Sequence, residues 1–369
     1  MTSLASSTPE RKVPVSPWNT PRGRFLAGLA GLAVVLVIAA TLALMGERAR
    51  TATRFAHTVI FPGLAAQLDS AGGVTVKTKE SEIVLALGAD NKWVARSLAD
   101  YPVSGENVRL LLIGLSNLTA VEEKTAQPAL HAALELGDPK DGGDATLVEV
   151  TDKDGKVLAA LLAGKRAPAA LEGEDRFYVR RAGEAQTYVA TGGLPRSVHP
   201  ADWLETSIVD IARDRVKSVA LTPLEGPSFR ISREKKDDAN FTLENVPKGR
   251  AVLNDTAANP IGAALAGLTL DDVRKAGEVD FAKAAHDVFE TFDGLTLTLD
   301  VANIDNDYWL RISAAGTGDA QGEADKINAR VGGWAYKVSA WKGEVLMREL
   351  ERQLQSLVPN APKVDGDQQ

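Results

Sequence analysis

The stretch VTVKTKESEIVLALGADNKWVA, residues 74–95, alternates apolar and polar side chains with a period of two. Val74, Val76, Ile83 and Leu85 fall on one side of this alternation, and a Gly-Ala-Asp-Asn run follows them. Such a period is typical of half-buried antiparallel strands, and the run has the composition of a tight turn. The stretch therefore predicts three short strands connected by turns.

The same plan occurs a second time in VKSVALTPLEGPSFRISREKKDDANFTLE, residues 216–244. Val219 and Leu221, and then Phe229 and Ile231, alternate with polar neighbours as in the first stretch. A segment with small and aliphatic residues follows each trio of strands, and we expect a helix in both, at NVRLLLIGLSNL (107–118) and at NPIGAALAGL (259–268).

The correspondence extends farther along both halves of the chain. A hairpin is predicted at 145–164, with its turn at DKDG, and its counterpart is predicted at 295–316, with its turn at NIDND. A strand and then a helix are expected to end each half, at 186–192 and 200–211 in the first and at 334–341 and 343–354 in the second.

The distance between the two sets is far longer than the ~20–50 residues of a solenoid repeat. The sequence therefore predicts an α+β fold with two tandem copies of an antiparallel sheet with packed helices, at 69–212 and 213–358.

An apolar segment precedes the predicted sheets. Residues 25–45, FLAGLAGLAVVLVIAATLALM, contain no charge. As a helix they would span about 31 Å, which matches the ~30 Å hydrocarbon core of a bilayer. A cleaved signal peptide is the alternative, but its apolar region is usually ~7–15 residues long. We therefore expect one transmembrane helix at 25–45 that anchors the protein in a membrane.

The flanking charges favour a cytoplasmic N-terminus and a periplasmic body, as expected for a single-pass protein of a bacterial inner membrane. More basic residues precede the segment (Arg11, Lys12, Arg22 and Arg24) than follow it (Arg48, Arg50 and Arg54). Residues 1–24 and 359–369 are expected to be disordered tails, and 46–68 a juxtamembrane neck that continues as a helix until Pro62.

Composition excludes several classes of function. The chain has no cysteine, so disulfides, thiolate metal sites and a cysteine nucleophile are impossible. Its net charge is −7, and the basic residues of the first 54 positions leave the predicted body still more acidic. Because an acidic body repels phosphates, we expect no nucleic-acid partner.

Several motifs resemble catalytic or binding sequences but have simpler interpretations. Gly316, Gly318 and Gly322 recur roughly as in a dinucleotide loop, yet the third glycine falls one residue late and no βαβ pattern surrounds them. Ser339 and Lys342 have the spacing of an acylating pair but lack its partner motifs. We interpret the first as a loop and the second as a chance spacing.

Metal ligands and paired acids are no better supported. Asn303, Asp305 and Asp307 begin like a calcium loop, but Tyr308 replaces its glycine and Ala314 its glutamate, so we favour a hairpin turn. The remaining candidates are scattered along the chain: the histidines His57, His131, His199 and His286, and the acids Asp237, Asp238, Asp271 and Asp272.

Large apolar side chains of the body are expected to form its core rather than a binding surface. These are the tryptophans Trp93, Trp203, Trp309, Trp334 and Trp341 and the stripe Val345, Leu346, Leu350, Leu354 and Leu357. Overall, the sequence predicts no catalytic, cofactor-binding or metal-binding residue and no cofactor.

Three segments carry a resemblance to a known family: IFPGLAAQL (60–68), LELGDPKDGGDATLVEVTDKDGKVLAALLAGK (134–165) and RFYVRRAGEAQTYVATG (176–192). Together with the N-terminal apolar segment they resemble the bacterial family catalogued as domain of unknown function 4340. Members often look like single-pass membrane proteins encoded beside ABC-type transporters. The family has no agreed catalytic residues, so the resemblance implies an accessory role without assigning a site.

Three functions remain as hypotheses. The first is a non-catalytic accessory or scaffold subunit of an ABC-type transport system, with a permease or another envelope protein as partner. The second is a periplasmic binding module for an envelope polymer or solute, with an aromatic-lined groove between the copies. The third is an envelope hydrolase, which requires two carboxylates, or a serine and a base, in one pocket.

Overall fold

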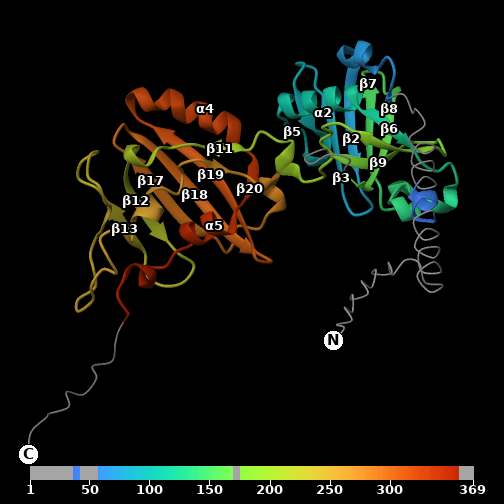
Figure 1. Cartoon of the computed structure of the whole chain (residues 1–369). Coiled ribbons are helices and arrows are strands. Elements are labelled where there is room, and N and C mark those ends of the chain that lie inside the picture. The colour runs from blue at the N-terminus through green and yellow to red at the C-terminus, as the bar shows by residue number, and fades with distance from the viewer. Residues whose placement is uncertain (1–35, 42–56, 169–174, 357–369) are drawn as a thin grey trace, which may run out of the picture. The chain divides into compact units, whose positions relative to one another are not determined.

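The computed structural model describes residues 36–41, 57–168 and 175–356 of the chain (Figure 1). The chain divides into two compact units, Met1–Thr58 and Val59–Gln369. In the first unit, residues 36–41 are helical; the rest of the predicted membrane segment 25–45, the tail 1–24 and the tail 359–369 lie outside the described residues. No helix within the described ranges is both long enough and apolar enough to cross a membrane.

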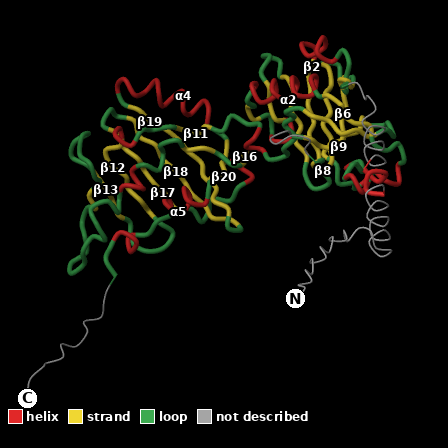
Figure 2. The backbone as a smooth tube through the Cα atoms, in the orientation of Figure 1, coloured by secondary structure: helices red, strands yellow, loops and turns green. Residues whose placement is uncertain are grey.

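The second unit is mostly β-sheet with a few short helices, an α+β fold of antiparallel sheets (Figure 2). Its first large sheet has the strand order β1-β6-β10-β9-β8-β7-β2-β3-β4-β5. Within the described residues these strands are β1 (Thr58–Val59), β2 (Ala71–Lys77), β3 (Glu82–Leu87), β4 (Trp93–Ala95), β5 (Tyr101–Pro102), β6 (Thr119–Glu123), β7 (Thr146–Asp152), β8 (Val157–Arg166), β9 (Arg176–Arg181) and β10 (Thr187–Thr191).

The second large sheet has the order β14-β13-β12-β17-β18-β19-β20-β16. Its strands are β12 (Val216–Thr222), β13 (Phe229–Ser232), β14 (Thr242–Leu243), β16 (Asp272–Lys275), β17 (Ala285–Thr291), β18 (Leu295–Ile304), β19 (Asp307–Gly316) and β20 (Trp334–Val338). A small antiparallel pair, β11 (Ser207–Val209) with β15 (Leu268–Thr269), lies outside both.

The two sheets have the same internal order. Reading the second sheet from β16 gives 16-20-19-18-17-12-13-14, and the first contains 6-10-9-8-7-2-3-4 between its added edge strands β1 and β5. Each strand thus has a counterpart at the same place in the other sheet. In the first sheet, β2 pairs with the next strand, β3, on one side and with the much later β7 on the other. In the second sheet, β12 pairs in the same way with β13 and β17.

This order changes one match expected from sequence. The hairpin β7–β8, with its turn at Asp152–Gly155, occupies the place of β17–β18, whose turn is at Thr291–Gly294. The hairpin at 295–316 is β18–β19 and corresponds to β8–β9 instead. The two equivalent turns share a glycine in the left-handed region, Gly155 at φ +84° and Gly294 at φ +87°.

Helices cover the sheets unevenly. In the first sheet's part of the chain, α2 (Gly105–Asn117) buries Val108, Leu111 and Leu115, as the sequence pattern predicted. In the second, α4 (Gln321–Val331) lies beside β19, where the side chain of Asn328 bonds both backbone groups of Ala314. That contact satisfies strand groups that the short β20 leaves unpaired.

Three helices expected from sequence are shorter than predicted or absent. Only α3 (Asn259–Gly262) forms in the stretch 259–268, since Gly262 and Gly267 interrupt it. The stretch 200–211 forms a single 3-10 turn (Pro200–Asp202) and then β11, because Ser207 and Val209 pair with the strand β15. The C-terminal helix ends early, as α5 (Ala340–Leu346), and a 3-10 turn follows at Leu350–Gln353.

The neck region also differs from its predicted helix where the structure describes it. Thr58–Val59 is the edge strand β1, and Leu64–Ser70 forms a 3-10 helix. The amide of Ile60 donates to the carbonyl of Leu118 at 2.8 Å, and the Arg181 guanidinium donates to the carbonyl of Ile60 at 2.8 Å from its Nε. The chain around Pro62 is therefore part of the first sheet's surroundings.

The second sheet shows clearly why its sequence forms strands. Leu295, Leu297, Leu299 and Val301 of β18 are fully buried, while the residues between them are half exposed. The hairpin turn after β18 has positive φ at both central residues, Asp305 and Asn306, the geometry of a two-residue type I′ turn. This confirms the turn interpretation of the calcium-like run.

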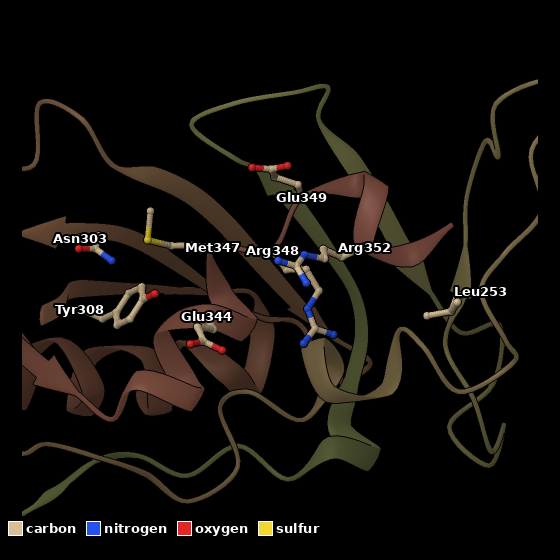
Figure 3. A pocket seen from close by; sticks show the side chains of 8 residues that line it. All are labelled: Leu253, Asn303, Tyr308, Glu344, Met347, Arg348, Glu349 and Arg352. Carbon is tan, nitrogen blue, oxygen red and sulfur yellow. The ribbon is translucent and has the colours of Figure 1, made fainter. Parts of the chain in front are cut away.

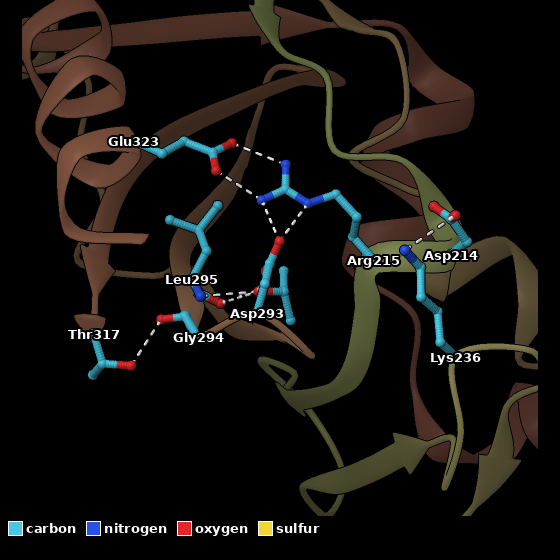
Figure 4. A network of polar contacts seen from close by, with 9 residues as sticks. Asp214, Arg215, Lys236, Asp293, Gly294, Leu295, Thr317 and Glu323 are labelled. Carbon is cyan, nitrogen blue, oxygen red and sulfur yellow. Dashed lines mark hydrogen bonds and ion pairs between the residues drawn. The ribbon is translucent and has the colours of Figure 1, made fainter. Parts of the chain in front are cut away.

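An arginine links three elements of this second sheet (Figure 4). Arg215, just before β12, donates to both carboxylate oxygens of Glu323 in α4, at 2.9 and 2.7 Å, and to Asp293 in the β17–β18 turn at 3.0 Å. These hydrogen bonds hold the pKa of Glu323 below its ordinary value. The bidentate geometry fixes α4 relative to the sheet.

We expect Arg215→Gln to lower the free energy of unfolding by about 1 kcal/mol at pH 7, because the contact is partly exposed. A carboxylate whose pKa is depressed on folding stabilises above its unfolded pKa of ~4.3 and loses that effect as the pH falls. The deficit should therefore shrink below about pH 4 in urea denaturation of the full chain. Arg109→Gln, which breaks a more exposed pair with Glu106 within α2, is the matched control; an equal effect of both variants would contradict the prediction.

Candidate functional site

A cavity of about 650 Å³ lies in the second sheet's part of the chain (Figure 3). The end of the β18–β19 hairpin forms one part of its lining, and the C-terminal segment that follows α5 forms another. The lining residues are Leu253, Asn303, Tyr308, Glu344, Met347, Arg348, Glu349 and Arg352.

Two arginines lie side by side in this cavity. Helix α5 ends at Leu346, so Arg348 stands in the break that follows and Arg352 in the 3-10 turn beyond it. Figure 3 shows their guanidinium groups next to each other. Within the described residues, neither side chain makes a hydrogen bond or an ion pair.

The neighbouring acids do not neutralise this pair directly. Glu351, which stands beside Arg352 in sequence, accepts instead from Arg250 at 2.9 Å. Burial, and then the charge of Arg352, lower the pKa of Arg348 from its ordinary value, and Glu344 opposes that effect only in part. The cavity therefore holds two like charges close together without a bound carboxylate.

The remaining lining is polar and held in place by close packing. Asn303 and Tyr308 are cross-strand partners at the end of the β18–β19 hairpin. A Cβ atom on Gly343 of α5 would lie 2.0 Å from the Tyr308 ring, so only glycine lets the helix pack there. Figure 3 shows the carboxylates of Glu344 and Glu349 on different sides of the arginine pair. The arrangement provides cations in the middle and hydrogen-bonding groups around them.

The residues of the motifs that resemble an acylating pair and a dinucleotide loop have structural roles. Lys342 donates to the carbonyls of Ala264 and Ala266 at 2.7 and 2.8 Å, and burial lowers its pKa. Ser339 precedes α5 as its N-cap residue. Gly316 ends β19, and a Cβ atom there would meet the backbone of Ala320 at 2.3 Å, so its role is close packing of the turn before α4.

The four histidines each have different surroundings. His131 bonds the carbonyl of Ala185 at 2.8 Å, His286 bonds Asp300 at 2.8 Å, His199 precedes a 3-10 turn and His57 is exposed. Within the described ranges no group of three His, Asp or Glu side chains is arranged to hold a metal ion. Asp237, Asp238, Asp271 and Asp272 are not lining residues of the cavity.

The apolar residues expected in the core divide into two groups. Trp203 and Trp309 are buried, Trp93 and Trp334 are half-buried, and Trp341 is exposed. In the C-terminal stripe, Val345, Leu346, Leu350 and Leu354 are buried, and Leu357 lies outside the described residues. Packing of this stripe within its own chain is confirmed for the four described residues. Sequence reasoning missed the arginines between them, whose four-residue spacing was the available signal.

One buried acid stands out in the second sheet. Asp287 of β17 is fully buried, and neither of its carboxyl oxygens has a hydrogen-bond partner among the described residues. Burial, and then the charge of Asp300, raise the pKa of Asp287 well above its ordinary value. Asp287 pairs with Leu221, and the equivalent pair in the first sheet is Val148 with Val76. The second sheet thus has an acid where the first has valine.

The comparisons with known proteins agree with the sequence resemblance. The model of one family, described as Domain of unknown function (DUF4340), matches residues 93–286, more than half of the chain. The chain belongs to the DUF4340 family. No curated protein and no solved structure matches it.

The matched range of the DUF4340 family begins at β4 in the first sheet and ends at His286 in β17 of the second. It includes the quoted segments 134–165 and 176–192 but not 60–68. Of the residues that line the cavity, it contains Leu253 alone. Membership of the DUF4340 family therefore assigns no role to the arginine pair.

We expect Asp287→Val to stabilise the protein by about 1–3 kcal/mol at pH 7, since it removes an unpartnered buried polar group. The folded state keeps the Asp287 proton to a higher pH than the unfolded state, so the acid destabilises increasingly as the pH rises above ~4. The gain from valine should therefore be smaller at pH 4 than at pH 7 in urea denaturation. Asp319→Val, at an exposed acid, is the control; a loss of stability in Asp287→Val would show that the carboxyl has a partner.

Proposed function

We propose that this protein is a single-pass, membrane-anchored envelope protein that works without catalysis as an accessory or scaffold subunit of an ABC-type transport system. In this proposal residues 25–45 hold it in a bacterial inner membrane, the N-terminus is cytoplasmic and the two sheets lie in the periplasm. The sheets are two tandem copies of one unit.

The observation that carries the proposal is the strand order that the two sheets share. Eight strands paired in one sequence of neighbours are unlikely to arise twice independently, because each sheet combines local hairpins with the same long-range junction. Duplication gives a body that presents two related surfaces, which suits a subunit that contacts a partner protein rather than one built around a single reaction centre.

The outer face of the second sheet is polar. One face of β18 is buried, and the other has the polar, partly exposed residues Thr296, Thr298 and Asp300. Asp300 accepts from Arg311 at 2.6 Å and pairs with His286 at 2.8 Å. An antiparallel sheet with a polar outer face is stable in water without a further covering layer.

The membrane and transport parts rest on the sequence and the family. The uncharged stretch 25–45 has the length of a bilayer-spanning helix. The chain belongs to the DUF4340 family. The transport role comes from the resemblance noted in the sequence, since members of that family often look like single-pass membrane proteins encoded beside ABC-type transporters. The binding-module alternative expected a groove between the copies, whereas the cavity with the arginine pair is lined by residues of the second copy.

Membrane anchoring has a direct test. The full chain with a C-terminal tag should stay in the membrane pellet after an alkaline wash, because a transmembrane helix is not released by pH or salt. A chain that lacks residues 1–45 is the matched control and should be released. A C-terminal reporter that is active only in the periplasm should report activity; activity solely from a cytoplasmic reporter would contradict the proposed orientation.

The transport role calls for a second experiment. The tagged full chain, solubilised from membranes of its native host in mild detergent, should copurify with permease subunits identified by mass spectrometry. The chain without residues 1–45 should recover less permease, since anchoring places both proteins in one plane and raises their effective concentration. Purification of the intact chain free of any transporter subunit would refute the accessory role.

A further inference from the structure

We infer that the cavity beside α5 binds a small soluble solute with one carboxylate or phosphate group and several hydroxyl groups. Arg348 and Arg352 receive the anionic oxygens, and Asn303, Tyr308 and Glu344 bond the hydroxyls. This site goes beyond the accessory role proposed above and does not depend on it.

The first argument is the charge in the cavity. Two guanidinium groups placed side by side repel each other, and no carboxylate among the described residues bonds either one. Guanidinium groups match carboxylate and phosphate oxygens through parallel N–H donors, and an anion between them would replace repulsion with two charge-assisted contacts.

The second argument is size and polarity. A volume of about 650 Å³ lies within the ~300–1,000 Å³ typical of small-molecule sites. A bare phosphate would leave most of that space empty, whereas a sugar acid or a sugar phosphate would also reach Asn303 and Tyr308. Glu344 and Glu349 would repel additional negative charge, so a ligand with a single anionic group fits better than a nucleoside triphosphate.

The third argument is that the second copy alone has the elements that build the site. Helices α4 and α5 have no counterpart between or after the equivalent strands β9 and β10 in the described part of the first copy. Gly343 then brings α5 onto Tyr308, and the break after Leu346 turns both arginines toward one space. The first copy keeps the sheet without this addition.

Calorimetric titration of the full chain in detergent tests the site with four named probes. Glucuronate and glucose 6-phosphate should bind, inorganic phosphate should bind more weakly than glucose 6-phosphate, and neutral glucose should not bind measurably. The difference between glucuronate and glucose isolates the carboxylate. A preference for glucuronate or for glucose 6-phosphate decides whether the natural anion is a carboxylate or a phosphate.

Variants of the arginine pair test the residues. Arg352→Gln is at an exposed position and should fold normally; it should weaken glucuronate or glucose 6-phosphate binding about 10- to 100-fold, the range expected for a charged hydrogen bond. Arg348→Lys keeps the charge but loses the fork of donors, so it should weaken binding less than Arg348→Gln. Lys283→Gln, which removes an exposed positive charge outside the cavity, should bind as the unaltered chain does.

A thermal measurement separates the site from general charge effects. Without ligand, Arg352→Gln should melt at a higher temperature than the unaltered chain, because the like-charge repulsion is removed; Lys283→Gln should not. The inference is overturned if none of the three anions binds, if glucose binds as tightly as glucuronate, or if Arg352→Gln and Lys283→Gln change binding equally.

Discussion

The structure depends on long-range strand pairs, and the central one in each sheet joins β2 with β7 or β12 with β17. A second such pair in each sheet joins β6 with β10 or β16 with β20. All other neighbours from β7 to β10 and from β17 to β19 are local hairpins, whereas these pairs join strands that are far apart in the chain. They bring Val76 opposite Val148 and Val219 opposite Phe289. Burial of such apolar pairs must offset the entropy of closing a long loop, and only then do two short meanders become one sheet.

In the second sheet a buried acid makes this junction less favourable, and an ion pair outside the junction adds stability. Asp287 stands at the β12–β17 junction, where the first sheet has Val148, and its carboxyl is buried without a partner among the described residues. The arginine link from Arg215 to Glu323 then ties the start of β12 to α4. In the second sheet, a bidentate ion pair thus ties the start of β12 to α4 close to a junction that contains a buried acid.

The cavity also lies where the two sheets differ. After the second sheet the chain continues past β20 into α5, and the end of that helix at Leu346 leaves Arg348 and Arg352 in a shared space. Adjacent like charges lower stability, as does a buried unpaired acid, and natural proteins break such local rules mainly at functional sites. In its described residues, the first sheet forms the same strand order with Val148 in place of the buried acid.

Sequence reasoning succeeded where the signal is local. Period-two alternation located β2, β3, β12 and β13, and the aliphatic face at 107–118 located α2. Sequence reasoning failed where pairing with a distant strand decides the structure. The hairpin β18–β19 was matched with β7–β8 in place of β17–β18, because β17–β18 and β18–β19 both show alternation and turn residues. Only the pairing of β17 with β12 shows that β17–β18 is the counterpart of β7–β8. The stretch 200–211 became β11 because a partner strand, β15, was available.

The amino-acid sequence by itself determined where most strands and α2 form and showed the apolar stretch at 25–45, because period, turn composition and hydropathy are properties of neighbouring residues. Tertiary structure alone decided the strand order, the isolation of Asp287 and the meeting of Arg348 with Arg352. These depend on which distant segments share a surface: the arginines are four residues apart, but the break after Leu346 and the packing of Gly343 on Tyr308 set where both side chains point.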